Sequence, residues 1–303
     1  MSIILGTLQQ GLLFGLLAVG IYISFRILNI PDLTTEGSFT FGLAVSAMIT
    51  INGHPFLAIL VGAASGFLAG VITGLLQTKC KIHPVLAGIL TMSGLYSINM
   101  WVMGEKANVT LISTPQQPVN TVFSLIEEKL GIADKDISEL IIIAVITAVM
   151  CVLLILFFKT QTGLSIRAAG NNDTMVRASS INVDRIKILA IAISNLCIGM
   201  CGAVYAQYQR FADINSGVGM LVVGLASVII GEVFTGKRGV TAGIIFAVIG
   251  SVIYRAIIAA ATHYDIFPAY MLKLVAALIV AVALTIPAVK SYITIARSKK
   301  GGA

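Results

Sequence analysis

Two carboxylates lie four residues apart in a short polar segment between two strongly apolar runs. The segment is NIPDLTTEGSFTFG, and its acids are Asp32 and Glu36. Pro31 ends the run before it, because proline cannot donate the backbone hydrogen bond that a continuing helix needs. Thr34 or Thr35 can cap the next helix, and Glu36 then falls in its first turn, near the positive end of the helix dipole. The segment is either a capped surface turn or a broken helix whose acids line a polar path.

Three further polar residues could belong to the same path. Asn195 and Glu232 lie inside or beside apolar runs, and Asn29 opens the polar segment. Asn195 taken alone is typical of a side chain that hydrogen-bonds between two packed helices. The complete set of candidate path residues is Asn29, Asp32, Thr34, Thr35, Glu36, Asn195 and Glu232.

A second motif is similar to a nucleotide-binding loop but lacks one of its essential residues. GEVFTGKR, from Gly231 to Arg238, has the glycines and the lysine of a P-loop at the right spacing. Arg238 stands where a serine or threonine must bind magnesium, and the preceding run is typical of an apolar helix rather than a strand. We therefore expect a tight turn here and no ATP site. If the protein uses ATP, another polypeptide binds it.

The sequence offers little for metal binding or catalysis. His54, His83 and His263 are scattered, and none has a partner at the spacing of metal ligands. Cys197 and Cys201 are four apart without a histidine or carboxylate in the same segment, so we expect two buried thiols. We expect no metal, no cofactor and no enzyme activity, because no nucleophile–base pair is present either.

The elements that position these residues are predicted to be membrane helices. Of the 303 residues, 57% are hydrophobic and 11% are charged, and the mean hydropathy is +0.98. A charge-free stretch of about 20 residues matches the hydrocarbon thickness of a bilayer. Apolar runs of about this length or somewhat shorter cover residues 3–25, 38–51, 56–76, 85–103, 140–158, 188–205, 218–234, 241–261 and 271–289. We predict an all-α polytopic membrane protein with about eight to ten transmembrane segments, forming one domain over residues 1–303.

The charged residues between the runs predict the orientation. Lysines and arginines cluster after the third, fifth, seventh and last runs, which lie on one side if the runs alternate. The positive-inside rule assigns this side to the cytoplasm and explains the net charge of +7 without nucleic acid as a partner. We expect residues 159–187 and the tail 290–303 in the cytoplasm, and the acidic loop 104–139 outside. Within that loop, VFSLIEEKLG is amphipathic and could lie on the bundle.

The second run is the one that fits this topology least well. It has only about 14 residues from Ser38, too few to span as an upright helix. It must recruit the polar segment as a broken helix near residues 29–42, which we favour, or re-enter the membrane. Nine crossings place the N-terminus outside and eight place it inside, and both remain open. In the third run, residues 66, 70 and 74 are glycines on one helix face, which we expect to pack inside the subunit.

A long polar insert, TGLSIRAAGNNDTMVRASSINVDRIK, separates the fifth and sixth runs. We predict two short helical pieces joined by a turn. Gly163 ends the preceding helix, residues 170–172 form the turn, and Asp173 caps the second piece.

The second piece also carries an apolar side. Met175, Ala178 and Ile181 follow each other at intervals of three residues, the spacing of one helix face. A basic element with such a side is either a linker on the membrane surface or a docking element for a cytoplasmic partner.

The insert and the helix after it resemble the permeases of ATP-binding-cassette (ABC) importers of the branched-chain amino-acid and ribose type. These share a G-L-x-x-R-A-x-G-x-N stretch, a following alanine and isoleucine, and a glycine-rich helix. The matching residues are Gly163, Leu164, Arg167, Ala168, Gly170, Asn172, Ala178 and Ile181. LNIPDLTTEGSFTFGLAVSA and GEVFTGKRGVTAGIIFAVIG are similar to further parts of the family. The DLTTEGSF form is closest to a bacterial subgroup linked to aromatic amino-acid uptake.

The resemblance implies partners and a role for the insert. It implies a second permease copy, a separate cytoplasmic ABC ATPase and an extracytoplasmic substrate-binding protein, at the inner membrane of a bacterium. It also implies that the insert couples to the ATPase through the eight matching residues, to which the apolar side of the second piece adds Met175. One departure stands out: Ser180-Ile181 replaces the Gly-Ile of the family.

These observations predict the permease of an ABC importer for an amino acid or a similar small polar solute. The alternative is an ion-coupled secondary transporter, which would favour acidic helix breaks in both halves of the chain. Only the first half has such a break, with Glu232 as a weak counterpart in the second.

Overall fold

The computed structural model describes residues 2–112, 119–130, 134–235 and 239–263, together with the isolated positions 274, 278, 281 and 285. The Lys237–Arg238 pair and the tail therefore lie outside the described residues. So does the last predicted run, 271–289, apart from those isolated positions.

The described chain is a helical bundle whose elements follow the predicted apolar runs. Their order is α1 (Ser2–Ile21), the π-helix η1 (Tyr22–Ile27), α2 (Thr35–Ile51), α3 (Pro55–Thr78), α4 (Pro84–Val102), β1 (Asn108–Thr110), α5 (Val122–Leu130), α6 (Lys135–Lys159), α7 (Gln161–Asn171), α8 (Asp173–Ala178), α9 (Val183–Gln209), β2 (Phe211–Asp213), α10 (Met220–Thr235) and α11 (Val240–His263). The eight apolar runs that fall on described residues are all helical, which confirms the all-α prediction.

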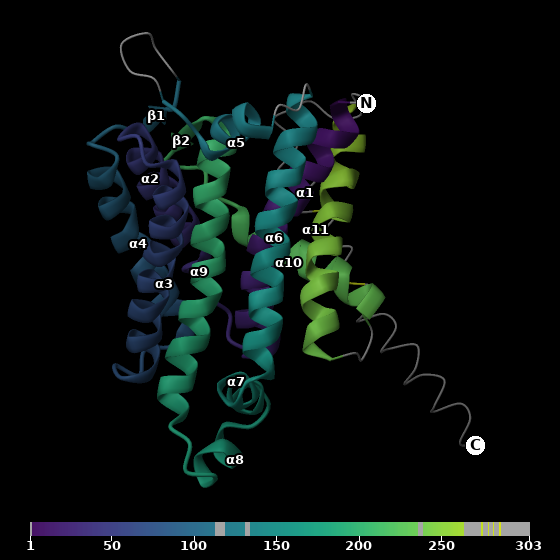
Figure 1. Cartoon of the computed structure of the whole chain (residues 1–303). Coiled ribbons are helices and arrows are strands. Elements are labelled where there is room, and N and C mark those ends of the chain that lie inside the picture. The colour runs from purple at the N-terminus through teal and green to yellow at the C-terminus, as the bar shows by residue number, and fades with distance from the viewer. Residues whose placement is uncertain are drawn as a thin grey trace, which may run out of the picture.

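The two ends of the bundle differ in structure (Figure 1). The short helices α7 and α8 cover one end, which we call the insert end. The opposite end, which we call the strand end, carries α5 and the strands β1 and β2, which pair antiparallel with Asn108 opposite Asp213. α1 begins at the strand end, where Gln9 Nε2 donates to the carbonyl oxygen of Asp136 at 2.7 Å. The N-terminus thus lies at the same end as the 104–139 loop, as the nine-crossing topology requires.

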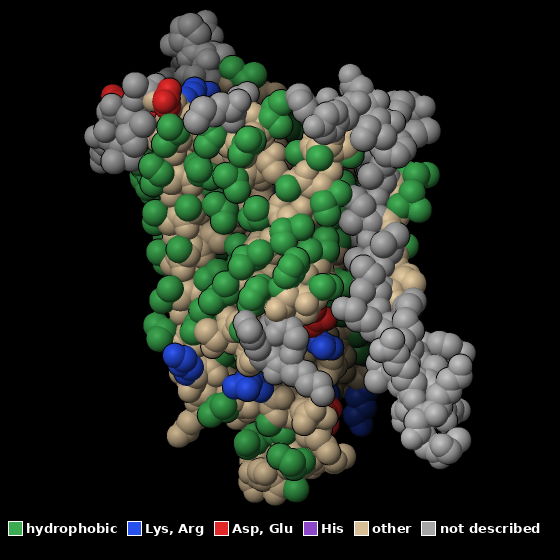
Figure 2. Space-filling model, turned by 90° about the vertical axis from the view of Figure 1, so that its right-hand side faces the viewer, with side chains coloured by type: hydrophobic (Ala, Val, Ile, Leu, Met, Phe, Trp, Pro, Cys, Tyr) green, Lys and Arg blue, Asp and Glu red, His purple; other side chains and the backbone are tan. Residues whose placement is uncertain are grey.

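A belt of apolar side chains surrounds the bundle between its ends. Six of the described helices are long and apolar enough to cross a membrane. Figure 2 shows one such face, where hydrophobic side chains fill the middle and most lysines and arginines gather near the insert end. The chain is therefore a multi-pass membrane protein, as its composition predicts.

The glycine face of α3 packs against α9 inside the subunit, as expected. A Cβ atom at Gly66 would lie 2.2 Å from the carbonyl oxygen of Asn195, and one at Gly70 would lie 2.7 Å from Cα of Ala192. At Gly74 the corresponding distance is 2.8 Å, to Cα of Ile188. Only glycine allows two helix backbones to approach this closely, so α9 is held at the centre of the bundle.

Two of the described helices that follow predicted apolar runs are too short to span the bilayer. α2 has 17 residues and α10 has 16, which at 1.5 Å per residue gives roughly 25 Å against a hydrocarbon thickness of about 30 Å. Each follows a non-helical segment that lies against other helices, so both are half-helices that begin inside the bundle.

Candidate functional site

The polar break before α2 is a buried hydrogen-bonded junction. Asp32 is only 3% exposed, and its carboxylate accepts hydrogen bonds from the backbone N–H of Thr34 at 2.9 Å and from Nδ2 of Asn195 at 2.6 Å. Asn195 also donates to the carbonyl oxygen of Ile191 in its own helix, α9. Asp32 therefore ties the start of α2 to the central helix, and these hydrogen bonds offset part of the cost of burying its carboxyl group.

The two threonines complete this junction, although not as predicted caps. Thr34 occupies the N-cap position of α2, but its side chain makes no capping bond. Its hydroxyl instead pairs with the hydroxyl of Thr73 in α3 at 2.8 Å, while Thr35 Oγ1 donates to the carbonyl oxygen of Asp32. Asp32 accepts from the backbone N–H of the N-cap residue Thr34, and not from the N–H groups of the first helical turn that a capping threonine would bind. The structure thus brings Asp32, Thr34, Thr35 and Asn195 together as one buried polar cluster.

Glu36 lies apart from this junction and faces a cavity. Its Oε1 accepts a hydrogen bond from the backbone N–H of Gly219 at 2.9 Å, directly before α10. α2 runs from Glu36 toward the strand end, whereas α10 runs toward the insert end, where Glu232 pairs with Arg26. The N-terminal ends of both half-helices therefore meet inside the bundle, and a carboxylate from one caps the other.

The cavity beside Glu36 has a volume of about 400 Å³. Its walls come from α2, α4 and the segment before α10: Glu36, Gly37, Thr40, Met92, Ser93, Tyr96, Asn99, Ile214, Asn215, Gly217 and Val218. Only Glu36 was among the predicted path residues. The missed segment DINSGVG, from Asp213 to Gly219, does carry a signal: it is rich in turn residues and precedes an apolar run of about 17 residues, the same pattern as the first break.

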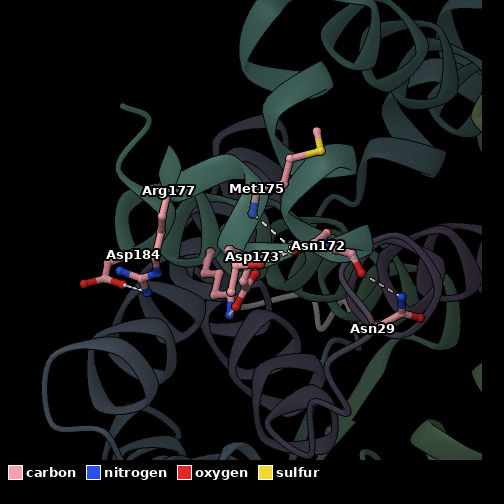
Figure 3. A network of polar contacts seen from close by, with 9 residues as sticks. Asn29, Asn172, Asp173, Met175, Arg177 and Asp184 are labelled. Atoms are coloured by element: carbon pink, nitrogen blue, oxygen red, sulfur yellow. Dashed lines mark hydrogen bonds and ion pairs between the residues drawn. The ribbon is translucent and has the colours of Figure 1, made fainter. Parts of the chain in front are cut away.

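Asn29 and Glu232 belong to the insert end instead. Asn29 has a left-handed φ of 54° and donates from Nδ2 to the carbonyl oxygen of Gly170 in α7 at 2.9 Å (Figure 3). Glu232 forms its ion pair with Arg26 in η1. Glu232 is therefore not the counterpart, in the second half of the chain, of the acidic break before α2. The break in the second half is the segment 214–219, which contains no acid.

The insert forms two short helices, as predicted, but with different boundaries. Thr160, and not Gly163, marks the change from α6 to α7, because its side chain accepts from the backbone N–H of Gly163. Asn172, and not Asp173, caps α8: its Oδ1 accepts from the backbone N–H groups of Thr174 and Met175 at 3.1 Å (Figure 3). Asp173 pairs with Lys187 of α9 instead.

One surface of the insert end is hollow and mixed in character. A hollow of about 610 Å³ is lined by several residues of the insert, of η1 and of the start of α11, among them Arg26, Asn29, Leu164, Arg167, Ala168, Gly170, Met175, Gly239 and Val240. Leu164 is 52% exposed and Met175 is 60% exposed. Two exposed apolar side chains beside two arginines are typical of a surface that binds another protein.

The predicted apolar side of α8 is wrong in its last member. Ser180 has a left-handed φ of 60°, so α8 ends at Ala178 and Ile181 lies beyond it. Ile181 packs instead on the small core of Ala169, Val176 and Val183, while Ala178 is exposed. Of the nine predicted coupling residues, Gly163, Asn172, Ala178 and Ile181 do not line the hollow.

α7 also contacts the chain next to the first break. A Cβ atom at Gly170 would lie 1.8 Å from the carbonyl oxygen of Ile27, the last residue of η1. Together with the Asn29 hydrogen bond, this contact joins the insert to the segment that leads to Asp32 and α2.

The chain has clear relatives among known proteins. Residues 3–284 match the family described as the permease component of the branched-chain amino acid transport system. A tyrosine transport system permease protein from Clostridioides difficile is 36% identical over 260 residues, which cover 84% of this chain and 81% of the relative. The ribose import permease protein RbsC of Haemophilus influenzae is 27% identical over 251 residues, covering 81% and 74%. No solved structure gave a significant match.

Proposed function

The chain belongs to the permease family of branched-chain amino acid transport systems, and from this premise we propose that it imports an amino acid. Members of this family are transport subunits of ABC importers, in which a separate subunit hydrolyses ATP. Membership decides against an ion-coupled secondary transporter. An amino acid is the proposed solute because the relative with 36% identity is named for tyrosine transport.

The orientation follows from the charge of the two ends. The insert end faces the cytoplasm in this proposal, because Arg26, Arg167, Arg177, Arg185 and Lys187 gather there. The strand end, with β1, β2, α5 and the N-terminus, then faces outward and receives the substrate-binding protein. The C-terminal tail would be cytoplasmic, and a second permease copy would complete the transporter in the bilayer.

The ATPase would bind the hollow at the insert end. Leu164 and Met175 offer apolar area, and Arg167 offers a charge for a carboxylate of the partner. The observation that carries this proposal is the direct contact of α7 with Ile27 and Asn29. Through this contact, a displacement of the insert reaches the first break without passing through a flexible loop.

Co-purification tests this assignment. The permease expressed with its ATPase should bring that subunit down, and Arg167→Glu should weaken the association because it reverses the charge in the hollow. Arg185→Glu is the matched control: it is on the same end but does not line the hollow. Equal recovery of the ATPase with Arg167→Glu and the wild type would place the docking surface elsewhere.

A further inference from the structure

We propose that the cavity between α2, α4 and the segment that leads into α10 is a recognition site for a zwitterionic α-amino acid. The ammonium group of the ligand would bind Glu36, and its carboxylate would bind the N-terminal end of α10. This inference rests on the proposed import function and adds the site and the groups of the solute that it reads.

Groups of opposite charge meet beside the cavity. Glu36 contributes a full negative charge, and the N-terminus of the 16-residue helix α10 contributes N–H groups without intrahelical partners and a partial positive charge. These two ends are joined by the hydrogen bond that Gly219 N–H donates to Glu36 Oε1. A zwitterion can replace that one hydrogen bond by two interactions. Its carboxylate accepts from the N-terminal end of α10, and its ammonium group donates to the carboxylate of Glu36.

The cavity wall also contains a buried acceptor without a hydrogen-bond partner among the described residues. Asn99 of α4 lines the cavity and is only 1% exposed, yet its Oδ1 has no hydrogen-bond partner among the described residues. An orphaned buried acceptor is unfavourable unless a ligand or water supplies a donor. Other buried polar atoms of the described chain also lack partners, but Asn99 alone among them lines this cavity. An ammonium group has three N–H donors, enough for Glu36 and Asn99 together.

The remaining walls suit the side chain of an amino acid. The volume of about 400 Å³ falls within the usual range of small-molecule sites, roughly 300–1,000 Å³. Met92, Ile214 and Val218 supply apolar contact, and the ring of Tyr96, 51% exposed, lies at the cavity wall. Such walls accept an apolar or aromatic side chain, and among the described residues that line them Glu36 is the one charged group.

A binding measurement on the intact transporter tests the proposal. The permease–ATPase complex in lipid nanodiscs, without the substrate-binding protein, is titrated with radiolabelled L-tyrosine. Tyramine lacks the carboxylate and 3-(4-hydroxyphenyl)propionate lacks the ammonium, so each should compete about tenfold more weakly than L-tyrosine or worse. Equal competition by either analogue, or no saturable binding of L-tyrosine, overturns the proposal.

Variants identify the residues. Glu36→Gln keeps an oxygen that can accept from Gly219 N–H but loses the charge, so it should weaken L-tyrosine binding about tenfold or more. Asn99→Leu removes the orphaned acceptor at similar volume and should weaken binding several-fold. Glu105→Gln, on the exposed surface after α4, is the control and should bind like the wild type. Wild-type affinity in Glu36→Gln, or in Asn99→Leu if the first variant does not fold, refutes the site.

The outcomes of these experiments distinguish a failure of the proposed binding site from a failure of the proposed import function. If the ATPase co-purifies and ATP drives uptake but L-tyrosine does not bind the cavity, only the site assignment fails. If no ATPase associates with the wild-type chain, the proposed import function fails, whatever the binding result.

Discussion

Replacing Gly170 by alanine should uncouple the insert from the transmembrane helices. The new Cβ would lie 1.8 Å from the carbonyl oxygen of Ile27, where an ordinary contact needs at least 3.4 Å. α7 or η1 must therefore move by about 1.6 Å, the difference between these distances. Overpacking of this kind is unfavourable by typically 1–3 kcal/mol, which corresponds to a change of about 5–150-fold in a coupled equilibrium.

The assay compares uptake with partner binding in the same preparation. Gly170 itself lines the hollow, but it adds no side chain to it, and Leu164, Arg167 and Met175 are unchanged in Gly170→Ala, so the ATPase should still co-purify with the permease. ATP-driven uptake into proteoliposomes should fall by at least about fivefold, the lower limit of this range. The thermal unfolding midpoint of the permease should fall as well.

A matched glycine provides the control. A Cβ atom at Gly6 in α1 would meet no neighbouring atom within 4 Å among the described residues, so Gly6→Ala adds the same methyl group without a clash. Alanine is favoured over glycine in a helix by about 1 kcal/mol, so Gly6→Ala should preserve or raise stability and leave uptake unchanged. Normal uptake by Gly170→Ala with an intact complex would show that the α7–η1 contact does not transmit the conformational change of the ATPase to the transmembrane helices.

Two further predictions concern local structure. Ser180→Gly should stabilise the junction of α8 and α9 by about 1 kcal/mol, because the left-handed φ of 60° is unfavourable for residues with a Cβ; slower hydrogen exchange over residues 173–187 would show it, and unchanged or faster exchange would contradict it. Asn195→Ala should lower the free energy of unfolding by about 2 kcal/mol, because it removes a buried donor to the carboxylate of Asp32; a thermal unfolding midpoint equal to that of the wild type would show that the junction contributes little.

The break before α2 shows where sequence reasoning reached its limit. Asp32 and Glu36 are four residues apart, so on one helix they would share a face. α2 begins at Thr35, however, which places Asp32 before the helix and Glu36 in its first turn. The two acids therefore point to different surroundings: one to the Asn195 junction, the other to the cavity. A polar break was predictable, but the separate roles of its acids were not.

The insert shows the same division. Its two helices, its basic character and its exposed apolar residues follow from local composition. The left-handed conformation of Ser180 removes Ile181 from the predicted apolar side. One sequence signal for this conformation existed: the resembling family has a glycine at the position of Ser180, and glycine favours a left-handed φ. The hollow itself required η1 and the start of α11, which are distant in the chain.

The sequence by itself determined the membrane class, the positions of the helices, the polar break and the glycine face of α3. These depend on the length of apolar runs and on helical spacing, which are local properties of the chain. Only the tertiary structure decided that Glu36 caps α10 and that Asn99 lies in the wall of the same cavity. Glu36 and Gly219 are 183 residues apart, and the packing of α2, α4 and α10 brings these groups together. No local pattern encodes that arrangement.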